Sequence, residues 1–473
     1  MDDKESLRRN TLFAAALSSF LTPFMGSSII VALPAISREF SMDAIALSWV
    51  STAFLLSAAA FLVPFGRASD IYGRRKIFIW GILVLSVFSL LSVIAMSGTF
   101  LIVCRILQGI GGAMIFGTGM SIVTAVYPPQ DRGKALGIVL TATYVGITLG
   151  PFVGGVLTDH LGWQSVFIAN AVIGLVIFVI AFWKIKEEWI EARGETFDLT
   201  GSIIYAFSLV STIYGLSLFP DKLGFLLVFP GLAGFVFFIY WISKIQYPVM
   251  EIHLFRNNRT FLFSNIAALI NYSATFAITF LLSLYLQYIM KLSAQQAGLI
   301  LVAQPLVMAG FAAITGKLSD RIEPRILSSA GMASLIVGLV LFAFMDEQST
   351  LRYIILNLML LGFGFALFIS PNTNAIMSSV EKRFYGVASG IMGTMRLIGQ
   401  SLSMGIVTLV FMLYMGRVTI TAENHPYFLQ SMKMSFVVFA VLCFFGVIAS
   451  LVRGNIRDEE GQGLSNNNKT ERQ

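Results

Sequence analysis

Residues 66–75 of the chain read GRASDIYGRR, and residues 316–325 read GKLSDRIEPR. Each stretch is polar, begins with a glycine, carries an aspartate four residues later and lies between two long apolar runs. The second stretch follows the first by 250 residues, and a similar echo joins the glycines and alanine of 133–137 to those of 386–390. This repeat predicts two similar halves with an insertion between them.

The composition around these stretches indicates a membrane protein. Hydrophobic residues make up 56% of the 473 residues and charged residues only 12%, whereas a soluble domain carries about 25% charged residues. The mean hydropathy is +0.81. The net charge of +7 does not indicate nucleic-acid binding, because Lys and Arg form short clusters between apolar runs, where basic residues orient membrane helices. Cys104 and Cys443 each lie inside an apolar run and predict neither a disulfide nor a metal site.

The lengths of the apolar runs predict how often the chain crosses the membrane. A helix that crosses a hydrocarbon core of about 30 Å needs about 20 apolar residues. We therefore expect an all-α polytopic protein with about fourteen spans, the first of them an uncleaved N-terminal span. The predicted spans are 11–35, 44–66, 77–97, 100–125, 134–157, 165–184, 199–219, 223–243, 260–288, 295–316, 326–345, 351–373, 386–415 and 431–452.

The basic residues predict the orientation of these spans. With the N-terminus inside, most of the 32 Lys and Arg residues fall in the inside segments, as the positive-inside rule requires. Both termini are therefore expected in the cytoplasm, with the protein in the plasma membrane of a cell that we expect to be prokaryotic. The expected division is a cytoplasmic N-tail (1–10), two six-helix halves (11–190 and 251–453), a linker with two extra spans (191–250) and a disordered tail (454–473).

Three motifs follow one another along the chain, between the second and third spans, in the fourth span and in the fifth. Their residues are Gly66, Asp70, Gly73, Arg74 and Arg75, then Arg105, Gln108 and Gly109, then Gly146, Gly150, Pro151, Gly154 and Gly155. These motifs resemble those of the major facilitator superfamily, in particular its fourteen-span drug:proton antiporters. The resemblance covers nearly the whole chain and implies two six-helix halves that rock about a central site, and proton-coupled export of hydrophobic or amphipathic compounds. Ile71 stands where the family usually has an arginine.

The first motif predicts a latch between the halves. Asp70 lies at a predicted cytoplasmic helix end, and the thirteenth span begins on the same side near Gly386. A helix N-terminus carries about half a positive charge, so Asp70 is expected to hold that end when the cytoplasmic side is shut. Asp320 is expected to do the same for the fifth span. The basic residues complete this latch, bind lipid headgroups or serve only as positive-inside anchors: Arg74, Arg75, Arg321 and Arg325.

Two arginines are left inside predicted spans. Charge at membrane depth usually faces a cavity or a partner. Arg105 lies about one and a half turns from the outer end of the fourth span, so it either bonds carbonyls, snorkels outward or faces the cavity. Arg396 is near mid-depth of the thirteenth span, which favours a cavity or a polar network.

No acidic residue is central to any predicted span, because all 25 fall in loops, tails or span ends. In the family, an aspartate in the first span is implicated in proton coupling, and Met25 occupies that position here. The sequence therefore predicts no mid-membrane proton acceptor. If protons couple, we expect Asp159 or Asp70 to carry them, ahead of Glu39 and Asp43.

The remaining candidates for a central cavity are neutral or aromatic. Apolar walls with a few amides suit an amphipathic or neutral organic ligand, and aromatic rings can also hold a lipophilic cation. For each residue taken alone, helix packing is an alternative role. The candidates are Met25, Trp49, Phe54, Asn265, Asn271, Tyr272, Phe276, Gln304, Asn372 and Asn374.

Three functional hypotheses follow. The first is a proton-coupled exporter of amphipathic compounds. The second keeps the fold but drops classical proton antiport, giving a facilitator or a transporter of a neutral or anionic metabolite or lipid. The third is an intramembrane enzyme or receptor, which is disfavoured because the sequence holds no HExxH, GxSxG or GxxxxGK[ST] motif. We expect a functional monomer in membrane lipid that takes a small-molecule substrate, without a cofactor, metal or nucleic-acid partner.

Overall fold

The computed structural model describes residues 2–128, 130–250, 252–256, 258–319, 321–381 and 384–454. These residues contain helices and no strand. They include fourteen helical spans that are long and apolar enough to cross a membrane, which confirms the predicted all-α architecture and span number. The predicted C-terminal tail lies outside the described residues, apart from Gly454.

The first six spans are single helices. The first begins at Asp2, so the segment predicted as an N-terminal tail is helical from Asp2 and continuous with the first span. The helices are α1 (Asp2–Phe40), α2 (Ala44–Tyr72), α3 (Arg74–Val93), α4 (Gly98–Val126), α5 (Arg132–Leu161) and α6 (Gln164–Lys184).

The second set of six spans is more irregular. Pro305 lacks the N–H that would bond to the carbonyl of Leu301, and the tenth span accordingly divides at this point. The ninth span ends in a π-helical turn. The elements are η1 (Ile252–Phe255), α9 (Arg259–Thr275), α10 (Ala277–Leu284), η2 (Tyr285–Ile289), α11 (Ala294–Leu301), α12 (Ala303–Ser319), α13 (Pro324–Ala343), α14 (Leu351–Ser378), α15 (Tyr385–Tyr414), η4 (Ala422–Asn424) and α16 (His425–Val452).

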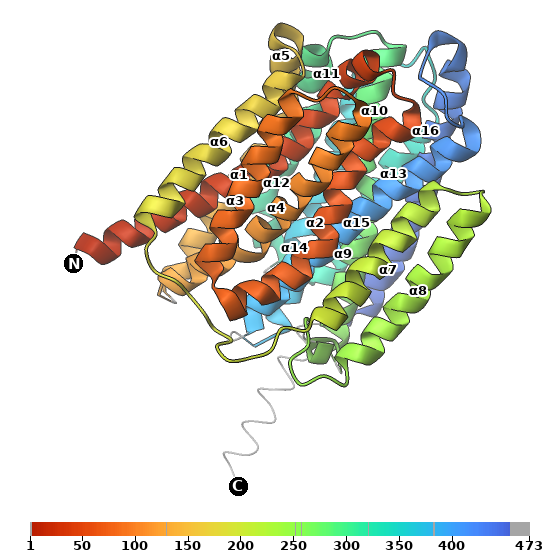
Figure 1. Ribbon diagram of the computed structural model, residues 1–473. Helices are drawn as coiled ribbons and strands as arrows, with labels where there is room; N and C mark the ends of the chain where they lie inside the picture. The colour runs from red at the N-terminus through yellow and green to blue at the C-terminus, as the bar shows by residue number, and fades with distance from the viewer. Residues whose placement is uncertain are drawn as a thin grey trace.

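Both α1 and α16 have their chain-terminal ends at the same end of the bundle (Figure 1). We call this the terminus end, and the opposite end the far end. The α2–α3 connection lies at the terminus end, and the α1–α2 and α5–α6 connections lie at the far end.

The two extra helices, α7 (Leu199–Ser217) and α8 (Lys222–Ile242), lie side by side on one flank of the bundle (Figure 1). The Tyr205 hydroxyl donates to the carbonyl of Ala59 in α2 at 3.0 Å. On the same helix, Ile213 lies against Gly405 of α15. The pair therefore covers the seam where α2 meets α15, and α7 contacts both halves.

Candidate functional site

The two six-helix halves are joined by hydrogen bonds at the far end. Side chains and backbone groups of α1 and α2 meet those of α10, η2 and the end of α15 there. The bonds run from Ser283 Oγ to Ile30 O (3.0 Å), from Gln287 Nε2 to Val31 O (3.0 Å), between Ser48 Oγ and Thr408 Oγ1 (2.8 Å), and from Ala44 N to Val418 O (3.0 Å).

Asp159, near the far end of α5, adds a charged contact between the halves. Its two carboxylate oxygens accept hydrogen bonds from the first backbone amides of α11, from Ala294 N at 3.1 Å and Gln295 N at 2.9 Å. A carboxylate at a helix N-terminus satisfies free N–H groups and is attracted by the helix dipole. Asp159 also borders a hollow of about 480 Å³ that Arg38 and Lys291 help to line. The candidate proton carrier is therefore in contact with the opposite half.

The fifth-span motif supplies close backbone contacts on both sides of α5. An added Cβ at Gly146, Gly150 or Gly154 would lie within 2.6 Å of atoms of α1. On another face of the helix, an added Cβ at Gly155 would lie 2.5 Å from the carbonyl oxygen of Ala294. Small residues let helices approach closely in lipid. Here they let α5 pack against its own half and against α11 of the other half.

At the terminus end, the halves are much less connected. The described polar contact between the halves at this end is that of Ser389 Oγ with Met120 Sδ at 3.6 Å. Several glycines in the parts of α5, α12 and α15 toward this end have nothing within 4 Å of an added Cβ: Gly133, Gly137, Gly316, Gly386 and Gly390. The described contacts between the halves are therefore concentrated at the far end, and these helices are loosely packed toward the terminus end.

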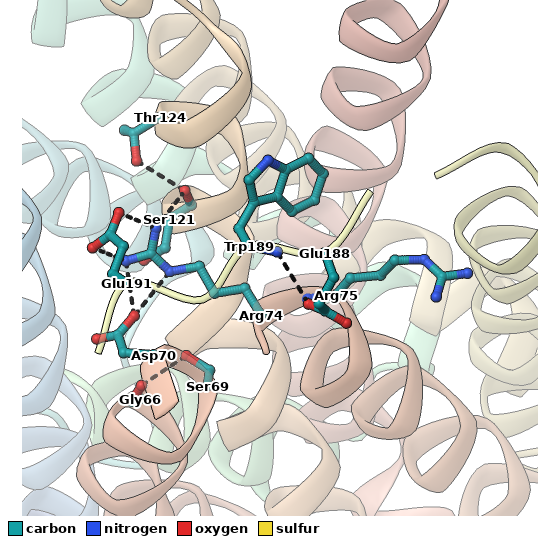
Figure 2. Close-up of polar contacts among 10 residues, drawn as sticks. All are labelled: Gly66, Ser69, Asp70, Arg74, Arg75, Ser121, Thr124, Glu188, Trp189 and Glu191. Atoms are coloured by element: carbon teal, nitrogen blue, oxygen red, sulfur yellow. Dashed lines mark hydrogen bonds and ion pairs between the residues drawn. The ribbon is translucent and has the colours of Figure 1, made fainter. Parts of the chain in front are cut away.

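The α2–α3 connection holds the first motif, and Figure 2 shows its polar contacts. Arg74 is paired with Asp70 at 2.8 Å and with Glu191 at 2.6 Å. Asp70 therefore contacts its own half rather than the start of α15. The predicted latch belongs to a state with the terminus end shut, so it stays a prediction for Asp70. Its counterpart Asp320 lies outside the described residues.

The other acidic partners of this motif come from the linker between α6 and α7. The sequence analysis did not identify these partners. Glu188 accepts hydrogen bonds from the backbone amides of Arg75 (2.8 Å) and Lys76 (3.2 Å), and so caps α3 after Gly73. Figure 2 shows Glu188 beside Arg75. Glu195 pairs with Arg67. Gly73 has φ +116°, a conformation that favours glycine. The acidic residues of 188–195 complement the basic residues of 67–76, and this complementarity was the available signal.

Arg75 also contacts the α6 end, donating to Phe182 O at 3.0 Å and to Ile185 O. In this structure the Arg74 side chain binds Glu191 of the linker and the Arg75 side chain binds carbonyls at the end of α6. Their proposed roles in a latch or at lipid headgroups stay predictions. In the second half, the backbone carbonyl of Arg325 accepts a hydrogen bond from Ser450 Oγ at 3.4 Å. The roles expected for the Arg321 and Arg325 side chains stay predictions.

Replacing Glu188 by glutamine is expected to lower the thermal unfolding midpoint. The change removes the charge of a helix cap, which is worth about 1 kcal/mol, or about 2–4 °C for a unit of this size. Glu187→Gln is the matched control, because the neighbouring Glu187 is exposed. Unfolding of both variants in detergent micelles measures the difference. Equal midpoints for the two variants would contradict this role of Glu188.

Arg105 belongs to a buried structural network. It is 1% exposed, and it donates to Val50 O at 2.9 Å and to Gln108 Oε1 at 2.7 Å. Its guanidinium lies 4.5 Å from the ring centroid of Phe54, a predicted cavity residue that is itself buried. Gln108 donates in turn to Phe88 O in α3. Of the alternatives for Arg105, the structure therefore places it in carbonyl bonding that ties α4 to α2 and α3.

Arg396 lies between the two halves. Its guanidinium is 5.4 Å from the ring centroid of Phe116 in α4. Tyr144 of α5 and Tyr272 of α9 are close enough to interact electrostatically with it. We call these four residues the Arg396 cluster. Two of its helices belong to each half, and one of its members, Tyr272, is a predicted cavity residue.

Other predicted cavity residues lie elsewhere. Trp49 packs edge-on against Tyr214 of α7 at 5.5 Å between ring centroids, so it faces the extra helix pair. The remaining amides make contacts within their own half or none: Asn265 donates to Phe261 O, Asn374 donates to Ser319 Oγ, and Asn271 is buried with neither side-chain atom bonded. Met25 and Gln304 are buried and Phe276 is half-buried, and their role in a cavity stays a prediction.

Arg453, after the end of α16, is a residue that the sequence analysis did not single out. It is 1% exposed and donates to Asn372 Oδ1 at 2.9 Å and to Ser328 Oγ at 3.3 Å. Burial lowers the pKa of its guanidinium to about 10, so it stays protonated at neutral pH. Asn372, predicted to line a cavity, therefore belongs to a network that ties α16 to α13 and α14.

A comparison with protein-family models matches this chain to the model described as "Major Facilitator Superfamily", over residues 15–404 and 265–470. The chain is 27% identical over 449 residues to the riboflavin transporter RibZ of Clostridioides difficile, covering 93% of this chain and 96% of the relative. It is 28% identical to the multidrug resistance protein Stp of Mycobacterium tuberculosis, covering 84% of this chain and 74% of the relative.

Other comparisons agree with this pattern. Multidrug resistance protein 3 of Bacillus subtilis is 28% identical, over 76% of this chain and 71% of the relative. Among solved structures, a bacterial homolog to the human lysosomal transporter Spinster, in an inward-facing and unoccupied conformation, matches with a TM-score of 0.70. That match has 17% sequence identity and covers 94% of this chain and 97% of the other, so it supports the fold alone.

Proposed function

Because this chain belongs to the Major Facilitator Superfamily, we propose that it exports hydrophobic or amphipathic organic compounds from the cell by alternating access. The observation that carries the proposal is the asymmetry between the ends. The halves are hydrogen-bonded at the far end and sparsely connected at the terminus end, and the Arg396 cluster stands between them. With the termini in the cytoplasm, the loosely packed end faces the cytoplasm.

Export is supported by two likenesses. The fifth-span motif resembles the antiporter signature of the family, and two relatives are named multidrug resistance proteins. In this proposal, substrate enters from the terminus end, the halves rock about the central site, and the far-end contacts break to release it. A proton would act through Asp159 or Asp70, since Met25 replaces the first-span acid.

A second candidate function is transport of a neutral or anionic metabolite without classical proton antiport. The specific observation in its favour is the central charge, which is the cation Arg396, while Met25 occupies the usual position of an acid. The likeness to a protein named as a riboflavin transporter agrees with it. The two candidates share the fold and the alternating-access cycle, and they differ in substrate charge and in coupling.

Purified protein in liposomes with an imposed pH gradient and an internal pH-sensitive dye tests both. Ethidium, riboflavin and fluorescein serve as a lipophilic cation, a neutral compound and an organic anion. Substrate-triggered proton movement is expected for a proton-coupled exporter. Transport without a proton signal supports the second candidate. Failure to move any of the three above protein-free liposomes, with protein inserted in both orientations, would count against export of amphipathic compounds.

A further inference from the structure

Arg396 is an intramembrane charge whose hydrogen-bond donors the protein does not use. In the part of the chain that the structure describes, no acceptor lies within hydrogen-bonding distance of its guanidinium, and its described contact is the ring of Phe116. A guanidinium has five N–H donors and stays protonated. Arg105, the other arginine predicted inside a span, donates hydrogen bonds to Val50 O and Gln108 Oε1. The two arginines therefore differ in whether the protein itself supplies acceptors to their guanidinium groups.

The free donors of Arg396 point to the interior and not to lipid. Every residue of α15 from Ile391 to Met412 is buried or half-buried, so this stretch of the helix does not border the hydrocarbon. Arg396 is eleven residues from the start of α15, roughly 16 Å along the axis at 1.5 Å per residue. This depth is too great for the side chain to reach the headgroups easily.

The four helices of the Arg396 cluster, all within the described part of the chain, place no acid beside the guanidinium. Helices α4, α9 and α15 carry no Asp or Glu, and in α5 the acid is Asp159 at the far end, bonded to α11. An unpaired charge at membrane depth costs at least a few kcal/mol. A bound anion would offset this cost, whereas a bound cation would be repelled by the guanidinium.

The rest of the cluster is aromatic. The Phe116 ring lies under the guanidinium. Tyr144 and Tyr272, on which the Arg396 charge acts, add aromatic rings and hydroxyls that donate or accept hydrogen bonds. Because the rings come from α4 and α5 of one half and α9 of the other, a ligand held here contacts both halves. Such a ligand binds differently when the halves move, which is the requirement for coupling binding to a conformational change.

We propose that the Arg396 cluster is a binding site for amphipathic aromatic anions, with a carboxylate or sulfonate group on the Arg396 guanidinium and the ring system against Phe116 and Tyr272. Planar carboxylates match the guanidinium fork in two parallel hydrogen bonds. The proposal rests on the proposed transport function, which it deepens by naming the charge and shape of the compound that the central site takes.

The test compares three probes of equal ring size: 2-naphthoate, 2-naphthamide and 2-naphthylmethylammonium. Their binding to the full chain in lipid nanodiscs is measured by isothermal titration calorimetry. The wild-type protein is expected to bind naphthoate at least about tenfold more tightly than the neutral amide, the effect of one hydrogen-bonded charge, and to bind the ammonium most weakly. Equal affinities for naphthoate and naphthamide in the wild-type protein would overturn the proposal.

Variants separate the charge from the rings. Arg396→Gln is expected to remove the preference for naphthoate over naphthamide, and Arg396→Lys is expected to keep part of it. Arg417→Gln, an exposed arginine beyond α15, is the matched control and should leave all three affinities unchanged. Phe116→Leu should weaken naphthoate and naphthamide alike. A preference that survives Arg396→Gln in folded protein would also overturn the proposal.

The binding assay does not depend on transport, so the two proposals fail separately. If the naphthoate preference follows Arg396 but liposomes move no compound, the site stands and the transport proposal fails. If liposomes transport compounds but the naphthoate preference is absent, the transport proposal stands and the anion site fails.

Discussion

Gly298→Ala is expected to abolish most transport and to leave the far end open. An added Cβ at Gly298 would lie 2.1 Å from the carbonyl oxygen of Pro151 in α5, across the contact between the two halves. The clash is with backbone and cannot be relieved by rotating a side chain. Overpacking of this kind costs about 1–3 kcal/mol, which is roughly 5-fold to more than 100-fold in a conformational equilibrium. We expect the cost to fall on the state with the far end closed, because that closure brings α5 and α11 of the two halves together.

A single cysteine reports the far-end state. Ser283 is fully buried and donates across the halves to Ile30 O, so Ser283→Cys, with Cys104 and Cys443 replaced by serine, should resist a membrane-impermeant maleimide while the far end is shut. Gly298→Ala should raise its labelling rate about tenfold or more and reduce liposome transport by a similar factor.

The matched control is Gly310→Ala in the same span. Nothing lies within 4 Å of an added Cβ at Gly310, so this change makes an identical substitution without a clash. Its labelling and transport should equal those of the parent protein. If Gly298→Ala and Gly310→Ala behave alike, the close approach of α5 and α11 does not hold the far end closed.

Asp159→Ala is expected to weaken the same closure through charge instead of shape. The substitution leaves the amides of Ala294 and Gln295 without the carboxylate that accepts from them. Loss of a helix cap costs about 1–2 kcal/mol, a factor of about 5–30 in the balance of states. Asp159→Asn keeps one acceptor and loses the charge, so its effect should be intermediate. Labelling of Ser283→Cys measures both.

Asp346→Asn is the control for Asp159. Asp346 also lies at the far end, but its carboxylate accepts from Gln348 N and Ser349 Oγ in its own loop. It should therefore leave Ser283→Cys labelling unchanged. Should Asp159→Ala label no faster than Asp346→Asn, the carboxylate is not part of the far-end closure.

The same variants test the proposed proton carrier. If Asp159 carries the proton, Asp159→Asn should end substrate-triggered proton movement in liposomes while exchange of substrate without a pH gradient continues. Loss of the closure alone would instead change exchange and proton movement together. The charged groups Arg38 and Lys291 border the same hollow, so Arg38→Gln provides a check that the effect belongs to Asp159.

Parts of the site followed from sequence and parts did not. The fifth-span glycines were identified by their four-residue spacing, and the structure gives each of them a close backbone contact. The depth of Arg396 was readable from its position in an apolar run. The pairing of Arg74 with Glu191 could not be read from the sequence, because Glu191 is 117 residues from Arg74 and lies in a linker. For the same reason Asn372 was assigned to a cavity although it bonds to Arg453.

About fourteen membrane crossings and two similar halves could be inferred from the order of residues. Hydropathy and basic-residue clusters act locally and add along the chain, so they can be read without knowing which helices pack together. The hydrogen-bond partners of the buried charges, in contrast, depend on the packing of distant helices. Arg105 and Arg396 both stand in apolar helices, but bonding at depth depends on acceptors that distant helices bring within about 3 Å. Folding supplied those acceptors to Arg105 and left Arg396 facing the interior.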